Sequence, residues 1–199
     1  EYGASPNQVS VLPQPFDPTD FEPVSSRQDR EFKRQVGLDP ERATILSVGR
    51  LSYGKGADRL DRIVRSVGQH SDRFQFCILG AGPYADRFDG LSDDLLVGPK
   101  TVPHSEVSDY FRSADLLIHP TRRDGLPNVI LEALAAEVPV AAAPVGEIPN
   151  YVESTMTEPE DYVDHILGED WPRSSKPKWF DRTIQKRRYM TVLERVAST

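Results

Sequence analysis

The chain reveals its architecture at residues 43–56, which read ATILSVGRLSYGKG. The apolar run at 44–48 has the length of a buried strand, and it leads directly into a glycine-rich loop at 49–56. The residues that follow place apolar side chains at helical spacing, namely Leu60, Ile63, Val64 and Val67. This stretch therefore predicts a strand, a loop and a helix in direct succession.

The same alternation continues outward from this unit. Further apolar runs of strand length lie at 74–79, 95–97, 115–118 and 138–142. Two more helices are predicted between them, one around Val107 to Ala114 and one over Pro127 to Ala136, with the proline at the first helical position. The pattern is typical of an α/β protein with a Rossmann-like, doubly wound parallel sheet. Ligands bind such sheets beyond the carboxyl ends of the strands, so the loops there are the predicted site.

The flanking segments are different in character. Residues 13–23, PQPFDPTDFEP, are too rich in proline for regular helix, and we interpret 1–40 as a linker from a missing N-terminal domain, since the chain begins at Glu1 rather than Met. Residues 41–155 form the predicted Rossmann-like domain. Residues 156–199 are predicted to be an acidic connector followed by an amphipathic helix over Trp179 to Val196.

Composition excludes several classes of protein. The 199 residues carry a net charge of −7, which argues against sequence-blind binding to nucleic acid phosphates. We find no apolar run of about 18 residues and no leader, so a cytoplasmic location is expected. With 18 Asp, 18 Arg and only 6 Lys, the surface fits a high-salt cytosol as a hypothesis. The single cysteine, Cys77, lies in an apolar run and is predicted to be a buried thiol.

The loop at 49–56 almost matches a phosphate-binding P-loop, with Gly49, Gly54 and Lys55 in register. Gly56 stands where the motif needs the Ser or Thr that holds magnesium, so a P-loop NTPase is disfavoured. What remains is Arg50 and Lys55, a guanidinium and an ammonium beside glycines at the end of a strand. This pair suits a diphosphate held without an obligatory metal.

The second motif is DGLPNVILE, residues 124–132. Gly125 and Leu126 precede the helix where a capping side chain would normally stand, so the first helical amides are open to an anion. Helical side chains lean toward the N-terminus, so Asp124 and Glu132 are expected to face one cleft and to accept hydrogen bonds from sugar hydroxyls. The four histidines show no spacing typical of metal ligands, and His119 is predicted to be packed or hydrogen-bonded.

Three segments together resemble a known family: VGRLSYGKG at 48–56, HPTRRDGLPNVILEALAAEVPVAAAPVG at 119–146 and PQPFDPTDFEP at 13–23. They are similar to the C-terminal, nucleotide-binding half of a retaining GT-B glycosyltransferase of glycosyltransferase family 4 (group 1). The resemblance implies a hexosyltransferase domain that binds a nucleoside diphosphate sugar, with no other cofactor and no metal. It also implies a missing acceptor-binding domain and, in the whole enzyme, peripheral membrane contact. This chain alone is expected to bind donor weakly and to transfer nothing.

The resemblance also implies roles for individual residues. Arg50, Lys55 and Asp124 take the catalytic positions, the first two on the donor diphosphate and the third at the donor sugar. Glu132 matches the acid that holds the ribose hydroxyls. The loop at 98–102 matches the segment that holds the base. The remaining positions implied to bind the donor are Gly49, Lys100, Val102, Gly125, Leu126, Pro127 and Asn128.

Three residues depart from the family pattern. Asp124 stands in place of a glutamate, Glu147 follows Gly146 where a second glycine is common, and Glu137 replaces a glycine and is expected to end the helix. Two alternatives to a transferase remain, of which the first follows from these departures. One is a degenerate module that binds nucleotide sugar without catalysis, and the other is an epimerase or phosphorylase that shares the half-fold.

Overall fold

A computed structural model describes residues 15–23 and 25–197 of the chain. Its centre is a six-stranded sheet in the order β3-β2-β1-β4-β5-β6, and every neighbouring pair is parallel. The strands are β1 Ala43–Val48, β2 Phe74–Leu79, β3 Leu96–Lys100, β4 Leu116–His119, β5 Val140–Ala142 and β6 Ser154–Thr155. The chain order reverses between β1 and β4, as in a doubly wound sheet. The predicted fold class is confirmed.

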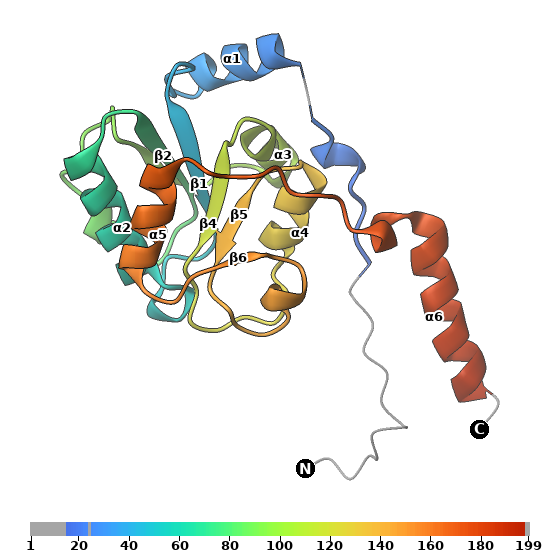
Figure 1. Ribbon diagram of the computed structural model, residues 1–199. Coiled ribbons are helices and arrows are strands. Elements are labelled where there is room, and N and C mark those ends of the chain that lie inside the picture. Colours follow the sequence, from blue (N-terminus) through green and yellow to red (C-terminus); the bar gives the residue numbers. More distant parts are fainter. Residues whose placement is uncertain (1–14, 24, 198–199) are drawn as a thin grey trace.

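Helices cover both faces of this sheet (Figure 1). They are α1 Ser26–Gln35, α2 Ala57–His70, α3 His104–Arg112, α4 Asn128–Ala135, α5 Pro159–Gly168 and α6 Arg182–Ala197. α2 and α5 pack side by side on one face, and α3 and α4 lie on the other. Short 3-10 turns connect these elements: Thr19–Phe21, Tyr53–Lys55, Ala85–Phe88, Ile148–Asn150 and Lys178–Phe180.

Alternation along the central strands builds two cores. In β4, Leu116 and Ile118 belong to the cluster under α2 and α5, whereas Leu117 belongs to the cluster under α3 and α4. Successive side chains of a strand point to opposite faces, so a fully apolar strand serves both cores at once. Cys77 of β2 is one of these buried residues, and burial raises the pKa of its thiol to about 12. Its predicted place in the core is confirmed.

The structure corrects several predicted boundaries. β3 runs on through 98–100, so part of the predicted base-binding loop is strand. Pro127 caps α4 rather than opening it, because its ψ of 142° is extended and helical geometry begins at Asn128. Glu137 ends α4 as expected, with a left-handed φ of 59°.

The C-terminal segment differs most from the prediction. α5 lies in the segment interpreted as an acidic connector, because Pro159 opens a helix that buries Tyr162 and Ile166 on the sheet. β6 lies at the end of the predicted Rossmann-like domain, in a part where no strand was predicted. The predicted final helix is split, because the carboxylate of Asp181 accepts the N–H groups of Thr183 and Ile184 and starts α6 at Arg182.

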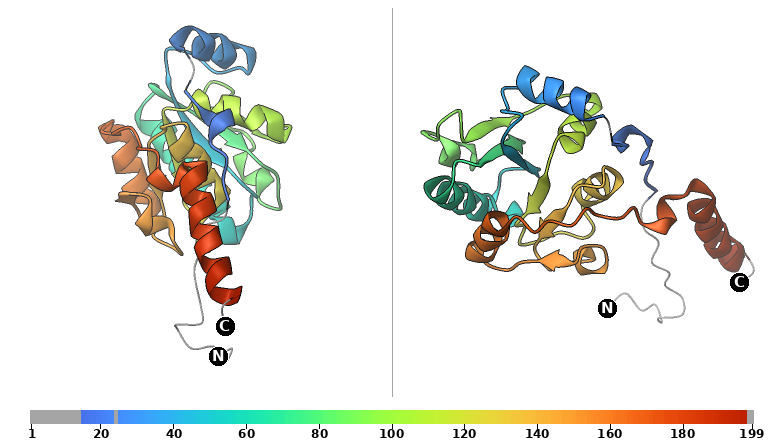
Figure 2. Two further views of the ribbon diagram at one scale, coloured as in Figure 1. Left: turned by 90° about the vertical axis from the view of Figure 1, so that its right-hand side faces the viewer. Right: turned by 45° about the horizontal axis from the view of Figure 1, so that its top comes forward.

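The two tryptophans pack in the tail region as predicted. Trp179 lies in the core and forms a T-shaped, edge-to-face pair with Phe180, and Trp171 packs against Phe74. α6 then projects away from the sheet (Figure 2), and it leaves Met190 and Leu193 exposed. Within residues 15–23 and 25–197, no helix is both long and apolar enough to cross a membrane.

Candidate functional site

Glycines bring four loops into backbone contact at the carboxyl edge of the sheet. A Cβ atom on Gly80, after β2, would lie 1.9 Å from the carbonyl oxygen of Gly49, after β1. A Cβ on Gly56 would lie 2.0 Å from the carbonyl oxygen of Pro120, after β4. A Cβ on Gly146, after β5, would lie 2.3 Å from the carbonyl oxygen of Gly125 and 2.4 Å from that of Asp124. Only residues without side chains allow this approach, so the predicted site loops form one continuous surface.

Arg50 and Lys55 lie on the first of these loops, in different environments. Arg50 is exposed, and its side chain makes no hydrogen bond or ion pair with any residue that the structure describes. Lys55 is half-buried, and its Nζ lies 2.6 Å from Oδ2 of Asp124 on the loop after β4. The structure therefore leaves one cation open and pairs the other with a predicted site residue.

Asp124 is the meeting point of this site. Its side chain is only 14% exposed, and its Oδ2 also lies 3.2 Å from Nε2 of His119, the buried last residue of β4. Burial raises the pKa of Asp124, but hydrogen bonds from His119 and Lys55 outweigh burial and hold that pKa at about 2. Asp124 is thus a carboxylate at any physiological pH. His119 was predicted to be packed or hydrogen-bonded, and it is both, but its partner Asp124 was not predicted.

A second missed group joins the loops after β1 and β4. The carbonyl oxygen of Gly54 accepts the backbone N–H groups of Arg122 and Arg123, at 3.0 and 3.2 Å. The guanidinium of Arg122 pairs with both oxygens of Asp58, at 2.5 and 2.7 Å, and stacks 4.0 Å from the centre of the Tyr53 ring. Arg122 is therefore a structural link between the loops.

The start of α4 keeps the uncapped geometry that the sequence predicted. Its capping residue, Pro127, offers no side-chain hydrogen bond, and Gly125 and Asn128 are exposed. Leu126 is half-buried against the core. Glu132 lies deeper, with its side chain buried, and burial raises the pKa of its carboxyl group. No hydrogen-bond partner of the Glu132 carboxylate occurs in the described part of the chain.

The remaining predicted residues flank this centre. Lys100 ends β3, and its Nζ lies 5.3 Å from the centre of the Tyr110 ring, while its carbonyl accepts the N–H of Gly80. Val102 is half-buried against the α3 and α4 core. Glu147, the departure after Gly146, donates its N–H to the carbonyl of Gly125 and accepts from Asn150 at 2.7 Å.

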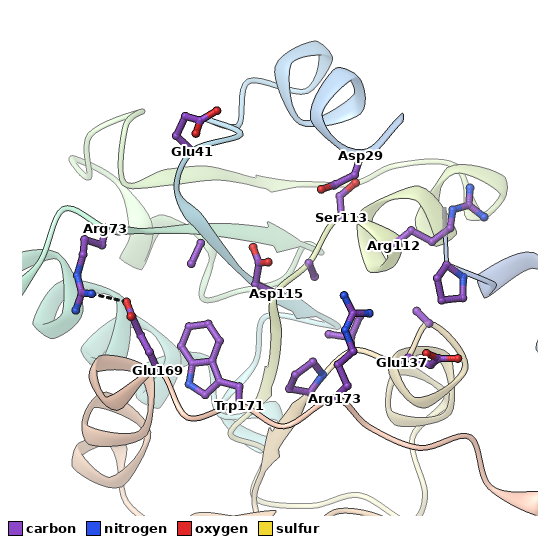
Figure 3. A pocket seen from close by; sticks show the side chains of 16 residues that line it. Asp29, Glu41, Arg73, Arg112, Ser113, Asp115, Glu137, Glu169, Trp171 and Arg173 are labelled. Carbon is purple, nitrogen blue, oxygen red and sulfur yellow. Dashed lines mark ion pairs between the residues drawn. The ribbon is translucent and has the colours of Figure 1, made fainter. Parts of the chain in front are cut away.

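A cavity of about 710 Å³ lies at the opposite edge of the sheet (Figure 3). Arg73, Asp115 and Trp171 are among its lining residues, and Arg73 pairs with Glu169 at 2.9 Å. Asp115 precedes β4, whereas His119 ends it, so the strand separates this cavity from the predicted site. In residues 15–23 and 25–197, no group of three His, Cys, Asp or Glu side chains is arranged to hold a metal ion.

The profile of one protein family, described as glycosyl transferases group 1, matches residues 28–158. The chain belongs to this family. The match spans the whole sheet and both motifs at its carboxyl edge, so the candidate site lies within the glycosyl transferase domain.

Two glycosyltransferases of similar sequence extend this comparison. This group 1 domain is 28% identical over 188 residues to D-inositol 3-phosphate glycosyltransferase 2 of Catenulispora acidiphila, covering 84% of the chain and 43% of that protein. It is 32% identical over 118 residues to the teichuronic acid biosynthesis glycosyltransferase TuaC, a putative enzyme of Bacillus subtilis, covering 59% of the chain and 29% of that protein. The chain thus spans less than half the length of these relatives.

Solved structures share the fold of this group 1 domain. The C-terminal domain of the group 1 family protein LpcC from Francisella tularensis superimposes with a TM-score of 0.66 at 16% identity, covering 90% of the chain and 97% of that domain. HepE from Anabaena, in complex with UDP and glucose, gives a TM-score of 0.74 at 18% identity, covering 98% of the chain and 57% of HepE.

Proposed function

We propose that the chain is the donor-binding domain of a retaining glycosyltransferase of family 4, and that it binds a nucleoside diphosphate sugar at the carboxyl edge of its sheet. The observation that carries this proposal is the ion pair of Lys55 with Asp124 on loops that glycines bring into backbone contact. Arg50 lies exposed on the first of these loops, and Glu132 lies on the helix that follows the second. The ligands named for the HepE structures, UDP and UDP-glucose, support a nucleoside diphosphate as the bound group.

Different residues bind different parts of the donor. Arg50 and Lys55 bind the diphosphate and stabilise the negative charge that grows on the leaving nucleoside diphosphate. The start of α4, which no side chain caps, adds backbone N–H donors for the same phosphates. The buried side chain of Glu132, whose carboxylate has no hydrogen-bond partner among the described residues, takes the two ribose hydroxyls as its hydrogen-bond donors. These interactions need no metal ion.

The rest of the proposed enzyme lies outside this chain. A preceding domain binds the acceptor and closes the cleft over the donor, and contact with a membrane surface belongs to that larger protein. Because half of the cleft is absent, we expect this chain to bind donor without transferring sugar. The relatives reported above are named as glycosyltransferases, and none of these names indicates an epimerase or a phosphorylase.

Calorimetric titration with UDP, GDP and ADP tests this proposal. We expect one of the three to bind saturably, and Lys55→Ala and Arg50→Ala each to weaken that binding by about tenfold or more, the effect of losing a charged hydrogen bond. Lys186→Ala is the matched control, because Lys186 is an exposed lysine on the projecting helix α6. Binding that survives both substitutions, or no binding at all, would contradict the proposal.

A further inference from the structure

The contact between His119 and Asp124 goes beyond the roles assigned so far. We propose that His119 is a positioning residue, whose Nε2–H holds Oδ2 of Asp124 so that Asp124 in turn holds Lys55 toward the donor diphosphate. The three groups come from the end of β4 and from the loops after β1 and β4. This inference rests on the proposed function only for the identity of the ligand that Lys55 meets.

The direction of the hydrogen bond follows from the charge of Asp124. Its carboxyl group is ionised and can only accept, so the nitrogen of His119 that lies 3.2 Å away must donate. Both donors, His119 and Lys55, contact the same oxygen, Oδ2, while among the described residues Oδ1 accepts from the N–H of Gly125 alone, at 3.2 Å. His119 therefore fixes the rotation of the carboxylate, with Oδ2 in contact with Lys55.

His119 is itself held rigidly. Its side chain is 7% exposed, and it pairs with Ala142 in the register of β4 and β5. Its carbonyl oxygen accepts the N–H of Ala143 at 3.1 Å and the hydroxyl of Tyr162 at 3.5 Å. A group fixed on a strand of the sheet is a more precise anchor than a loop side chain.

The proposed effect of His119 is the ordering of the Lys55 side chain. Its ammonium has three N–H donors, and within the described residues only Asp124 takes one of them, so two remain for phosphate oxygens. A lysine side chain loses conformational entropy when it is ordered. The hydrogen bonds that join His119, Asp124 and Lys55 order the Lys55 side chain before the ligand binds. Less conformational entropy is then lost on binding.

Three substitutions separate a positioning role from simple packing. His119→Gln keeps an N–H at about the distance of Nε2 from the backbone, His119→Asn keeps an amide that falls short of Asp124, and His119→Leu removes the donor. His70→Gln is the matched control, because His70 ends α2 and is exposed. Thermal unfolding identifies any variant that fails to fold. If His119→Leu does not fold, His119→Asn alone serves as the variant without a donor to Asp124.

The first readout needs no ligand. The exchange of the Lys55 ammonium protons with water, measured by nitrogen-detected NMR at pH 6, is expected to be at least threefold faster in His119→Asn and His119→Leu than in the wild type. It should return to the wild-type rate in His119→Gln and stay there in His70→Gln. Equal exchange rates in all five proteins would overturn the inference.

The second readout is the affinity for UDP, GDP and ADP. We expect the dissociation constant of the diphosphate that binds to rise by about threefold to tenfold in His119→Asn and His119→Leu and to change by less than twofold in His119→Gln. Unchanged affinity in both former variants overturns the inference even if the ammonium exchange has changed. A wild-type protein that binds none of the three overturns the proposed function, and the exchange rates then decide alone whether His119 positions Lys55.

Discussion

Glu132 places its carboxylate in a buried position that disfavours a charge when no ligand is bound. The side chain is buried between apolar neighbours on α4, and burial raises the pKa of the carboxyl group. A buried charge without a hydrogen-bond partner costs stability, and a residue that performs a function is often retained at such a cost. Glu132 therefore links the stability of the domain to its proposed ribose contact.

Glu132→Gln is expected to stabilise the protein at pH 8 and to leave it unchanged near pH 4. The folded pKa lies above the unfolded value of 4.5, so the stability that Glu132 contributes is complete below pH 4.5 and is lost as pH rises through the folded pKa. A gain of about 1 kcal/mol at pH 8 would raise the Tm by roughly 2–4 °C. The same variant should bind nucleoside diphosphate several-fold more weakly. A stability gain that is equal at both pH values would contradict this account.

At the scale of single residues, the sequence indicated which residues belong to the candidate site better than it indicated the hydrogen bonds and ion pairs between them. Arg50, Lys55 and Glu132 were predicted because glycines and helix spacing place them at the carboxyl edge of the sheet. The link from His119 to Lys55 was missed because it joins side chains 64 positions apart whose meeting depends on how closely two loops approach. No pattern of neighbouring residues in the sequence indicates how closely the two loops approach.

Between elements, Gly80 makes the closest approach in the site. A Cβ atom there would lie 1.9 Å from the carbonyl oxygen of Gly49, and this obstacle is backbone that cannot rotate away. We expect Gly80→Ala to lower the free energy of unfolding by about 2–4 kcal/mol, the usual range for overpacking combined with backbone strain. Gly54→Ala is the control, because nothing lies within 4 Å of a Cβ at Gly54. Urea unfolding checks both, and equal effects would contradict the close contact of the two loops.

The end of α4 offers a substitution in the opposite direction. Glu137 adopts a φ of 59°, a left-handed conformation that disfavours side chains and that glycine adopts freely. Its carboxylate also lies 3.7 Å from Nζ of Lys176, a half-exposed pair of little value. We expect Glu137→Gly to be more stable than Glu137→Ala by about 1 kcal/mol in urea unfolding. Comparing these two variants removes the ion pair from the difference, and a more stable alanine variant would contradict the prediction.

Among the elements, sequence patterns predicted those with many apolar residues and missed those that depend on a few. β1, β2 and α2 were predicted because each carries a full apolar run or stripe. α5 was missed because its burial depends mainly on Tyr162, Val163 and Ile166 within an acidic segment. The last helix was predicted too long because Trp179 and Phe180 match its apolar spacing, although they belong to the core.

Over the whole molecule, two electrostatic effects oppose each other. The chain carries a net charge of −7, so its folded form repels itself, while the candidate site places Arg50 and Lys55 on one edge of the sheet. Salt screens both kinds of interaction, because the Debye length falls from about 10 Å at 0.1 M to about 3 Å at 1 M. Salt should therefore strengthen the fold and weaken the binding of an anion.

This opposition gives a prediction that separates the fold from the site. Raising KCl from 0.1 to 2 M is expected to raise the Tm, as the high-salt hypothesis requires, and to weaken the binding of the nucleoside diphosphate. The screening of Arg50 and Lys55 accounts for the second effect, so Lys55→Ala should show a smaller dependence of affinity on salt than the wild type. A Tm that does not change with KCl removes the high-salt hypothesis. An affinity that rises with KCl would mean that charge attraction does not hold the ligand, and the roles of Arg50 and Lys55 would fail together.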